Sequence, residues 1–352
     1  MADRPPVIDV DGHVQDQPNL IRKHLEPPWD RRPTGLVPGD QPWDRENFGT
    51  IPLYPGFSRS LGPAEQVEFW LRLMDEHNVA HAALFPGQGA APKLREPAFA
   101  AAVCRATNNH YAKDWNPLSD RVHVLGVLPI RQPEEAAREL RRAVTELGIT
   151  AFEILPTGLP TALGESFYDP VYEEAARLGA ALIVRGTPSH SDNVGAGSFT
   201  TFNEVHTYAI PAGLLLQFTS IIFHGVPVRF AGLRLGFLEA GASWLPYWLD
   251  RMDAHWEQRG EVETPHLKQR PSDVVRASPI FFSIEADETL LPQTVDYLGD
   301  THFMYSSDLP HWDSQFPKSL DQLWTHASLT RESKEKILYS NARSFLALSS
   351  VP

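Results

Sequence analysis

Short apolar runs alternate with amphipathic stretches along most of the chain. Such runs, rich in Val, Ile, Leu and Phe and bounded by Gly, Pro or polar residues, are typical of buried β-strands. Eight strands are predicted, at residues 7–13, 81–85, 122–130, 150–155, 180–184, 233–238, 279–284 and 302–306. A helical pattern follows each of them. Eight strand–helix pairs in 352 residues predict an α/β protein with a (β/α)8 barrel, the TIM barrel, as a single domain over residues 1–352.

The main alternative for this alternation is an open, doubly wound sheet. A sheet of that kind would be expected to carry a glycine-rich phosphate loop after an early strand. The nearest candidate, Gly87-Gln88-Gly89, lacks a third glycine and has no helix start close behind it. Helices are predicted from residue 63 onward and at residues 96–114, 133–147, 169–179, 200–223, 243–257, 289–298, 319–326 and 332–346. The pattern therefore favours the barrel.

Residues 14–63 break the alternation. They are rich in Pro, Gly, Asp and Trp and show little periodicity. A connection of this length inside a compact domain is usually functional. We expect a long insertion after the first strand that covers the mouth of the barrel, where the carboxyl ends of the strands meet, or that contacts a second copy of the chain. A homodimer is the expected assembly.

Composition narrows the class of partner. The chain carries 31 Lys and Arg against 44 Asp and Glu, a net charge of −13, which disfavours nucleic acid and anionic membranes as partners. The single cysteine, Cys104, excludes an internal disulfide and is expected to be a buried, inert thiol. The N-terminus lacks the apolar core of a signal peptide, and the longest apolar run, residues 212–223, is interrupted by polar residues. We therefore expect a cytoplasmic, water-soluble protein that acts on a small molecule.

Acids and histidines stand where the first and last strands end. Asp9, Asp11 and His13 occur at every second position of the first strand, so all three are expected on one face. Asp308 follows the eighth strand, with His311 just beyond it. Catalytic residues of a (β/α)8 barrel lie at the carboxyl ends of its strands. Asp11, His13 and Asp308 are therefore predicted to hold zinc or manganese.

Other candidates lie at the ends of the middle strands. Glu153 lies near the end of the fourth strand, Arg185 directly follows the fifth, and Glu239 directly follows the sixth. His206, in a helical stretch after the fifth strand, could act as a general acid or base or as a metal ligand, or could pack on the helix surface against Tyr208. Trp244 and Trp248 have helical spacing, which is more typical of core residues than of a substrate platform, although Trp244 remains a candidate for substrate contact.

Three motifs resemble one family in order and spacing. They are Asp9-Val10-Asp11-Gly12-His13, the run at residues 233–248, and Ser307-Asp308-Leu309-Pro310-His311. They resemble the amidohydrolase-related family, the branch of the amidohydrolase superfamily with the aminocarboxymuconate-semialdehyde, resorcylate and carboxyvanillate decarboxylases. The resemblance implies a (β/α)8 barrel with one divalent metal, held by an acid-or-His-x-His motif on strand one, a histidine on strand five and an aspartate on strand eight.

The chain departs from the family pattern at two of these positions. Asp11, His13 and Asp308 match the implied ligands, but the strand-five position is Arg185, whose protonated guanidinium offers no lone pair to a metal. On strand six, where the decarboxylases have a catalytic histidine, this chain has Glu239. Three outcomes stay open. His206, His190 or Glu239 completes the metal site, the metal binds weakly, or no metal binds.

In the last case Arg185 would pair with Asp11, Asp308 or Glu239 and place a cation where the metal would be. A guanidinium can also bind a substrate carboxylate through two parallel hydrogen bonds.

The functional hypothesis is an enzyme that acts on a small carboxylated or carbonyl compound, aromatic or conjugated, by non-oxidative decarboxylation or hydrolysis. Asp308 or Glu239 would be the general base with assistance from His206, and Arg185 is a further catalytic candidate. The residues expected to contact the substrate are Arg185, His190, Trp244 and His311. Two alternatives are a metal-free barrel that catalyses isomerisation, cyclisation or condensation, and a non-catalytic binding or scaffold subunit.

Overall fold

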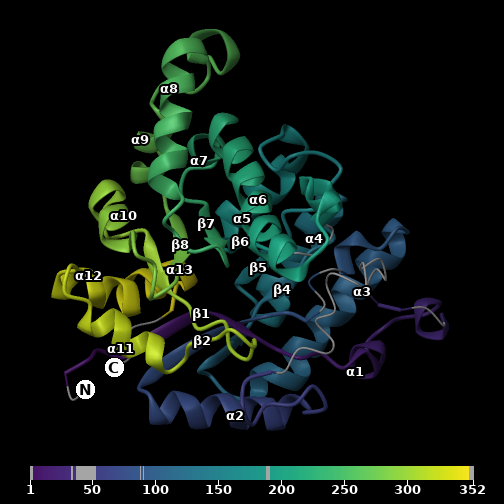
Figure 1. The fold of residues 1–352 in the computed structure, drawn as a ribbon. Coiled ribbons are helices and arrows are strands. Elements are labelled where there is room, and N and C mark those ends of the chain that lie inside the picture. Colours follow the sequence, from purple (N-terminus) through teal and green to yellow (C-terminus); the bar gives the residue numbers. More distant parts are fainter. Residues whose placement is uncertain are drawn as a thin grey trace.

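The computed structural model describes residues 3–32, 35–36, 53–87, 89, 91–187 and 191–348. Its strands lie in the middle of the molecule, with the helices around them (Figure 1). The strands are β1 (Val7–His13), β2 (Val79–Phe85), β3 (Val122–Val124), β4 (Gly126–Val127), β5 (Ala151–Ile154), β6 (Ala181–Arg185), β7 (Arg234–Leu238), β8 (Ile280–Ile284) and β9 (Phe303–Tyr305).

All strand pairs are parallel and follow the order of the chain. A three-stranded sheet has the order β1-β2-β3, and a six-stranded sheet has the order β4-β5-β6-β7-β8-β9. Leu125 alone separates β3 from β4, and its N–H still donates to the carbonyl of Leu84 on β2. Past β9, the N–H of Asp308 donates to the carbonyl of Asp11 on β1. The two sheets thus follow one another in the order expected for a TIM barrel. If β3 and β4 are counted as one interrupted strand, the number of strands agrees with the eight that the sequence predicts.

The helices are α1 (Pro18–Arg22), α2 (Pro63–Glu76), α3 (Pro97–His110), α4 (Pro133–Leu147), α5 (Asp169–Leu178), α6 (Phe202–Phe223), α7 (Val226–Arg229), α8 (Leu245–Glu263), α9 (Pro271–Ala277), α10 (Leu291–Leu298), α11 (Lys318–Thr325), α12 (Arg331–Glu335) and α13 (Asn341–Leu346). Proline at the start of many of them fits the first helical turn, whose N–H groups have no partner within the helix. The predicted helix at 332–346 is divided into α12, a π-helical turn and α13.

Two large groups of buried side chains form most of the core, and two smaller groups lie beside them. The inner group fills the barrel with residues such as Ile8, Val10 and Ile183, and Phe345 of α13 joins it. The larger outer group packs the strands against the surrounding helices. Since both faces of the strands are covered, the strand sequences are almost continuously apolar.

The prediction that Asp9, Asp11 and His13 share a face is wrong for Asp9. The register of β1 on β2 shifts between Asp9 and Gly12. Beyond the shift, Asp11 and His13 reach the site, whereas Gly12 faces the ring of Trp70. The carboxylate of Asp9 instead accepts hydrogen bonds from the backbone N–H groups of Asp11 and Ser307.

The third strand is also shorter than predicted. It was expected to extend over residues 122–130, but regular pairing ends at Val127. Pro129 follows two residues later and has no N–H to donate to a neighbouring strand.

Parts of the predicted insertion at residues 14–63 are described. Helix α1 lies beside α3, and the N–H of Tyr54 donates to the carbonyl of Pro310 at 2.9 Å, next to the mouth. Phe57 packs edge-on against Phe69 of α2. Residues 33–34 and 37–52 lie outside the described residues, so the predicted cover over the mouth stays a prediction for them.

Helix α6 is the one helix in the described part of the chain that is long and apolar enough to cross a membrane. Half of that stretch is buried inside the protein. Leu214 and Phe218 of α6 pack in the outer core, and this packing accounts for apolar residues on that side of the helix.

Candidate active site

The side chain of Arg185 lies at the centre of a cluster at the carboxyl ends of the strands. Its Nη2 donates to Glu239 Oε2 at 2.6 Å and lies 3.1 Å from Nε2 of His13. The same nitrogen is 3.9 Å from Asp308 Oδ1, and Arg185 Nε is 3.5 Å from Asp11 Oδ1. The cluster therefore joins β1, β6 and the segments after β7 and β9.

The Arg185 guanidinium is held in place by more than its ion pairs. It lies over the ring of Phe85, 5.0 Å from the ring centroid, in a cation–π contact. The residue is 9% exposed. Burial alone would lower the pKa of Arg185, but the carboxylates of Glu239, Asp11, Glu153 and Asp308 raise it overall.

Two histidines share the carboxylate of Asp308. Its Oδ1 lies 2.8 Å from His13 Nε2 and 2.7 Å from His311 Nδ1. The two imidazole rings stack with their centroids 4.0 Å apart. Burial by itself would raise the pKa of Asp308, but His311 and His13 bring it well below its usual value. Asp308 is therefore the ionised carboxylate of the site.

Glu239 has the opposite electrostatic environment. Burial is the main cause of a pKa well above the usual value, and the nearby Asp308 and Asp11 carboxylates add to it, while Arg185 opposes the shift. A pair of carboxyl groups whose environments push their pKa values apart is typical of acid–base sites.

The backbone at both acids is unusual. Glu239 has φ 88° and Asp308 has φ 54°, two of the four non-glycine residues with positive φ in the described chain. The left-handed conformation costs about 1–2 kcal/mol for such residues. The surrounding structure fixes it, because the N–H of Glu239 donates to Ser283 Oγ and that of Asp308 donates to the Asp11 carbonyl. Such strain is concentrated at functional sites.

A small cavity of about 100 Å³ opens beside Glu239 and Asp308. His206 of α6 lines it, which favours the predicted site role over packing against Tyr208. The His206 ring stacks on Phe202 and meets the edge of Trp312, and burial lowers the pKa of His206. The other lining residues are Ile210, Glu285, Ala286, Asp287, Ser306, Ser307, Asp313, Ser314, Gln315 and Ser319.

A further acid near Arg185 is Glu153, a strand-end residue to which the sequence analysis gave no role. Glu153, at the end of β5, is 5% exposed, and its Oε2 accepts no hydrogen bond from the described residues. Burial raises the pKa of Glu153 to about 7, and Asp11 adds to the shift while Arg185 and Lys93 oppose it. Trp312 and Asp313 were missed, although they directly follow the Pro-His turn that the sequence analysis singled out.

Some predicted site residues lie elsewhere. Trp244 packs edge-on against Phe218 and Phe282 of the outer core, and its indole N–H donates to the carbonyl of Gly241. The structure thus places it outside the cavity and behind the barrel wall, where it acts as a core residue. His190 lies outside the described residues.

The donor atoms of this cluster suit a divalent metal. Asp11, His13, Glu239 and Asp308 each offer one ligand atom within 4.8 Å of the others, and His13, Asp308 and His311 form an overlapping group. Asp11 Oδ1 is buried and accepts no hydrogen bond from the described residues. The Arg185 guanidinium does not suit such an ion, because it lies within 4 Å of all four donor residues of the first group. As arranged, the residues fit a metal only if Arg185 moves.

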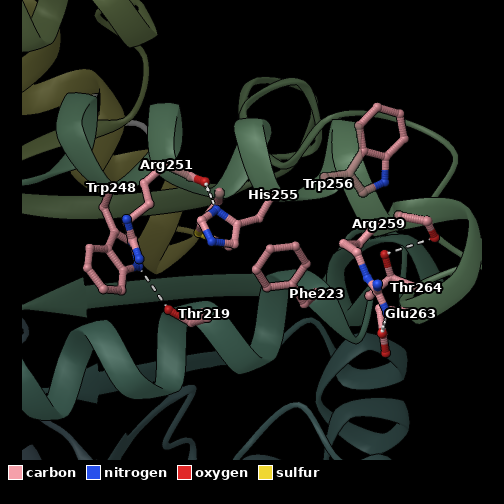
Figure 2. A pocket seen from close by; sticks show the side chains of 11 residues that line it. Thr219, Phe223, Trp248, Arg251, His255, Trp256, Arg259, Glu263 and Thr264 are labelled. Carbon is pink, nitrogen blue, oxygen red and sulfur yellow. Dashed lines mark hydrogen bonds and ion pairs between the residues drawn. The ribbon is translucent and has the colours of Figure 1, made fainter.

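A larger cavity, of about 510 Å³, lies on the outside of the barrel (Figure 2). Thr219 and Phe223 of α6 form one side, and Trp248 and His255 of α8 lie across from them, with Trp248 Nε1 donating to Thr219 Oγ1 at 2.8 Å. His206 lies near the start of the same helix, 13 residues before Thr219, which is about 20 Å along the helix axis. This cavity is therefore separate from the strand-end cluster.

Comparisons with known proteins agree with these observations. A family model described as amidohydrolase matches residues 8–348. The 2-amino-3-carboxymuconate-6-semialdehyde decarboxylase of Dictyostelium discoideum is 26% identical over 254 residues, which cover 72% of this chain and 68% of that protein.

Two solved structures share the fold at 18% identity. An amidohydrolase from Mycobacterium avium subsp. paratuberculosis has a TM-score of 0.79 and covers 97% of this chain and 99% of its own. A dihydroxybenzoic acid decarboxylase from Polaromonas sp., with bound manganese and the inhibitor 2-nitroresorcinol, has a TM-score of 0.72 and covers 99% of this chain and 98% of its own. The chain is therefore an enzyme of the amidohydrolase family, in the branch that includes these decarboxylases.

Proposed function

We propose that the protein catalyses the non-oxidative decarboxylation of a small aromatic or conjugated carboxylic acid. In this reaction the bond between the carboxylate and the carbon skeleton breaks, a proton takes its place on the carbon, and CO₂ leaves. The observation that carries the proposal is the pair of Arg185 and Glu239, 2.6 Å apart at the strand ends. It combines a permanent cation with a carboxyl group that can hold a proton.

The two members of this pair would have separate tasks. The Arg185 side chain is 11% exposed and could attract the substrate carboxylate to the cluster. Glu239 lines the cavity and would deliver the proton to the substrate carbon. General acid catalysis of this kind contributes roughly 10²–10⁴-fold to a rate. His206, across the same cavity, would return the proton to Glu239 or position the substrate.

Asp308 would act through the histidines. It is ionised and holds both imidazole rings, so that His13 lies against Arg185 and His311 stacks on its outer side. The proposed reaction uses no metal ion, because the Arg185 guanidinium lies among the atoms of His13 and Asp11 that would bind one.

The size of the cavity supports a small substrate. Its volume of about 100 Å³ is below the roughly 300–1,000 Å³ of sites for drug-sized ligands. The curated relative acts, by its name, on 2-amino-3-carboxymuconate 6-semialdehyde, and the neighbouring manganese structure is a decarboxylase of dihydroxybenzoic acid. Both names describe small carboxylic acids with conjugated skeletons.

The test is a screen of hydroxylated benzoic acids and conjugated dienoic acids with the purified protein. The expected result is CO₂ release with one equivalent of the acid consumed. In D₂O, the product should carry deuterium at the carbon that lost the carboxylate. Consumption of an ester, lactone or amide without CO₂ release would instead indicate hydrolysis and would overturn the proposal.

A further inference from the structure

We propose that the guanidinium of Arg185 takes the place of a divalent metal ion in this site, and that the native enzyme binds no metal there. The catalytic use of this built-in cation rests on the proposed function. The exclusion of the metal rests on the geometry alone and can be tested without a substrate.

The first argument is the position of the guanidinium. Arg185 Nη2 is 2.6 Å from Glu239 Oε2, 3.1 Å from His13 Nε2 and 3.9 Å from Asp308 Oδ1. A metal bound by His13 and Asp308 would sit about 2.0–2.2 Å from each ligand atom. It would therefore share the space between these donor atoms with Nη2.

The second argument is charge. A guanidinium stays protonated in proteins, so it cannot become a neutral neighbour of a metal ion. Asp308 is the ionised carboxylate of the cluster, and the guanidinium lies within 4 Å of it and of the carboxyl groups of Asp11 and Glu239. One fixed positive charge already compensates part of this negative charge, as a bound cation would.

The third argument is that Arg185 is locked where it stands. The side chain is nine-tenths buried, lies over the Phe85 ring at 5.0 Å, and is paired with Glu239. Moving the guanidinium away would leave the buried carboxyl group of Glu239 without its ion-pair partner. Breaking a buried ion pair in this way is strongly unfavourable. A metal must therefore displace the guanidinium before it can bind.

A second group of potential metal ligands has to be controlled for. His24, His110 and Asp114 also bring ligand atoms within 4.8 Å of one another, and none of the three belongs to the strand-end cluster. His110 Nε2 accepts a hydrogen bond from the Trp115 indole, so its Nδ1 carries the proton that faces Asp114. This arrangement needs no metal, but added metal could bind there and be mistaken for metal in the active site.

The experiment measures metal content and Mn²⁺ binding in the whole chain of 352 residues. Wild type, Arg185→His and the matched control Arg121→His are each expressed with zinc and manganese in the medium and purified without chelator. Arg121 lies before β3 and pairs with Asp75, away from the cluster. Each variant is also made with His24→Ala, which removes one of the three ligands of the second group. Elemental analysis gives the stoichiometry, and electron paramagnetic resonance of titrated Mn²⁺ gives the binding.

The proposal expects less than about one tenth of an equivalent of metal in wild type with His24→Ala. Arg185→His should gain about one equivalent, which Asp11→Asn should then abolish. Arg121→His should gain none. Circular dichroism and thermal unfolding establish that each variant is folded.

One equivalent of metal in wild type that survives His24→Ala and is lost on Asp11→Asn would overturn the proposal. So would a folded Arg185→His variant that gains no metal. If that variant does not fold, Mn²⁺ titration of the wild-type protein still decides. An absence of CO₂ release in the substrate screen would refute the proposed function, whereas the metal measurements would stand on their own.

Discussion

At the scale of single residues, Arg185 determines what the strand-end cluster can hold. It contacts Glu239 and His13 directly and lies within 4 Å of Asp11 and Asp308. Two unit charges of the same sign 4 Å apart repel by about 4 kcal/mol at an effective dielectric constant of 20, and a divalent ion would double this value. A histidine at the same position would add a ligand instead of a repelling charge.

The first prediction concerns Glu239 as proton donor. Glu239→Gln keeps the size of the side chain and an oxygen that accepts from Arg185, but it removes the ionisable proton. We expect kcat for CO₂ release to fall by about 10²–10⁴-fold, with a much smaller change in KM. Glu257→Gln, on the exposed face of α8 where it pairs with Arg270, is the control and should keep the wild-type kcat. A Glu239→Gln variant with normal kcat would exclude Glu239 as the acid.

The second prediction concerns the pH dependence of stability. The pKa of Glu153 is raised by burial from 4.5 to about 7 in the folded protein. The folded state therefore binds this proton more tightly than the unfolded chain. The contribution of this bound proton to the free energy of unfolding is fully present below pH 4.5 and is lost as the pH rises through about 7.

Glu153→Gln removes this titration. Between pH 4.5 and 7, the free energy of unfolding of the variant should rise relative to wild type, by up to about 3 kcal/mol. Urea unfolding at a series of pH values measures the difference. A difference that stays constant over this range would show that Glu153 keeps an ordinary pKa.

Residue types alone were enough to predict much of the cluster. Asp11, His13, Glu239, His206, Asp308 and His311 all lie at or beside it. Asp11 and His13 were found because they stand at the end of the first predicted strand. Glu239 and Asp308 come just after strands, and His206 and His311 lie in the segments that follow strands. Glu153 was recognised as a strand-end acid but was given no role, and Trp312 was missed. The sequence does not tell which strand-end side chains point toward a given neighbour. Trp244 could not be separated from a substrate platform until its packing against Phe218 and Phe282 was seen.

At the scale of elements, β1 carries a feature that positions the site. The register shift between Asp9 and Gly12 turns Asp11 and His13 toward the barrel mouth and Gly12 toward α2. A Cβ on Gly12 would lie 2.4 Å from Trp70 Cη2 and 2.7 Å from Leu84 Cδ2. Only glycine allows Trp70 to pack this closely behind the site.

The third prediction follows from this contact. Gly12→Ala should lower the free energy of unfolding by about 1–3 kcal/mol, because the added methyl group overpacks a dense core. Trp70→Phe removes the atoms that the methyl group meets, so the double variant should lose less than the sum of the two single changes. Denaturant unfolding of the four proteins gives the coupling. Strictly additive losses would mean that the two residues do not compete for this space.

Element order was predictable from the sequence, and element boundaries were less so. Alternation of apolar runs and helical patterns gave the strands and most helices, because each strand is buried on both faces. The break at Leu125 and the shift within β1 arise from how neighbouring strands pair. Pairing depends on contacts distant in the chain, so a local pattern cannot reveal it.

At the scale of the whole molecule, the barrel brings the two ends of the chain together. The N–H of His13 donates to the carbonyl of Leu309, and that of Asp308 donates to the carbonyl of Asp11. Residues nearly 300 positions apart thus form one site. Counting strands predicted this outcome, because only a closed arrangement makes the first and last strands neighbours. The homodimer, which was predicted from residues 14–63, stays a prediction.

The most direct test of the central claim is the rate of CO₂ release after metal removal. Wild-type enzyme is dialysed against a strong chelator, and its kcat on the best acid from the screen is compared with that of untreated enzyme and of enzyme given Mn²⁺ or Zn²⁺. An active site built around Arg185 predicts the same kcat in all three samples. A loss of activity with chelator that added metal restores would contradict the account and return the site to metal-dependent chemistry.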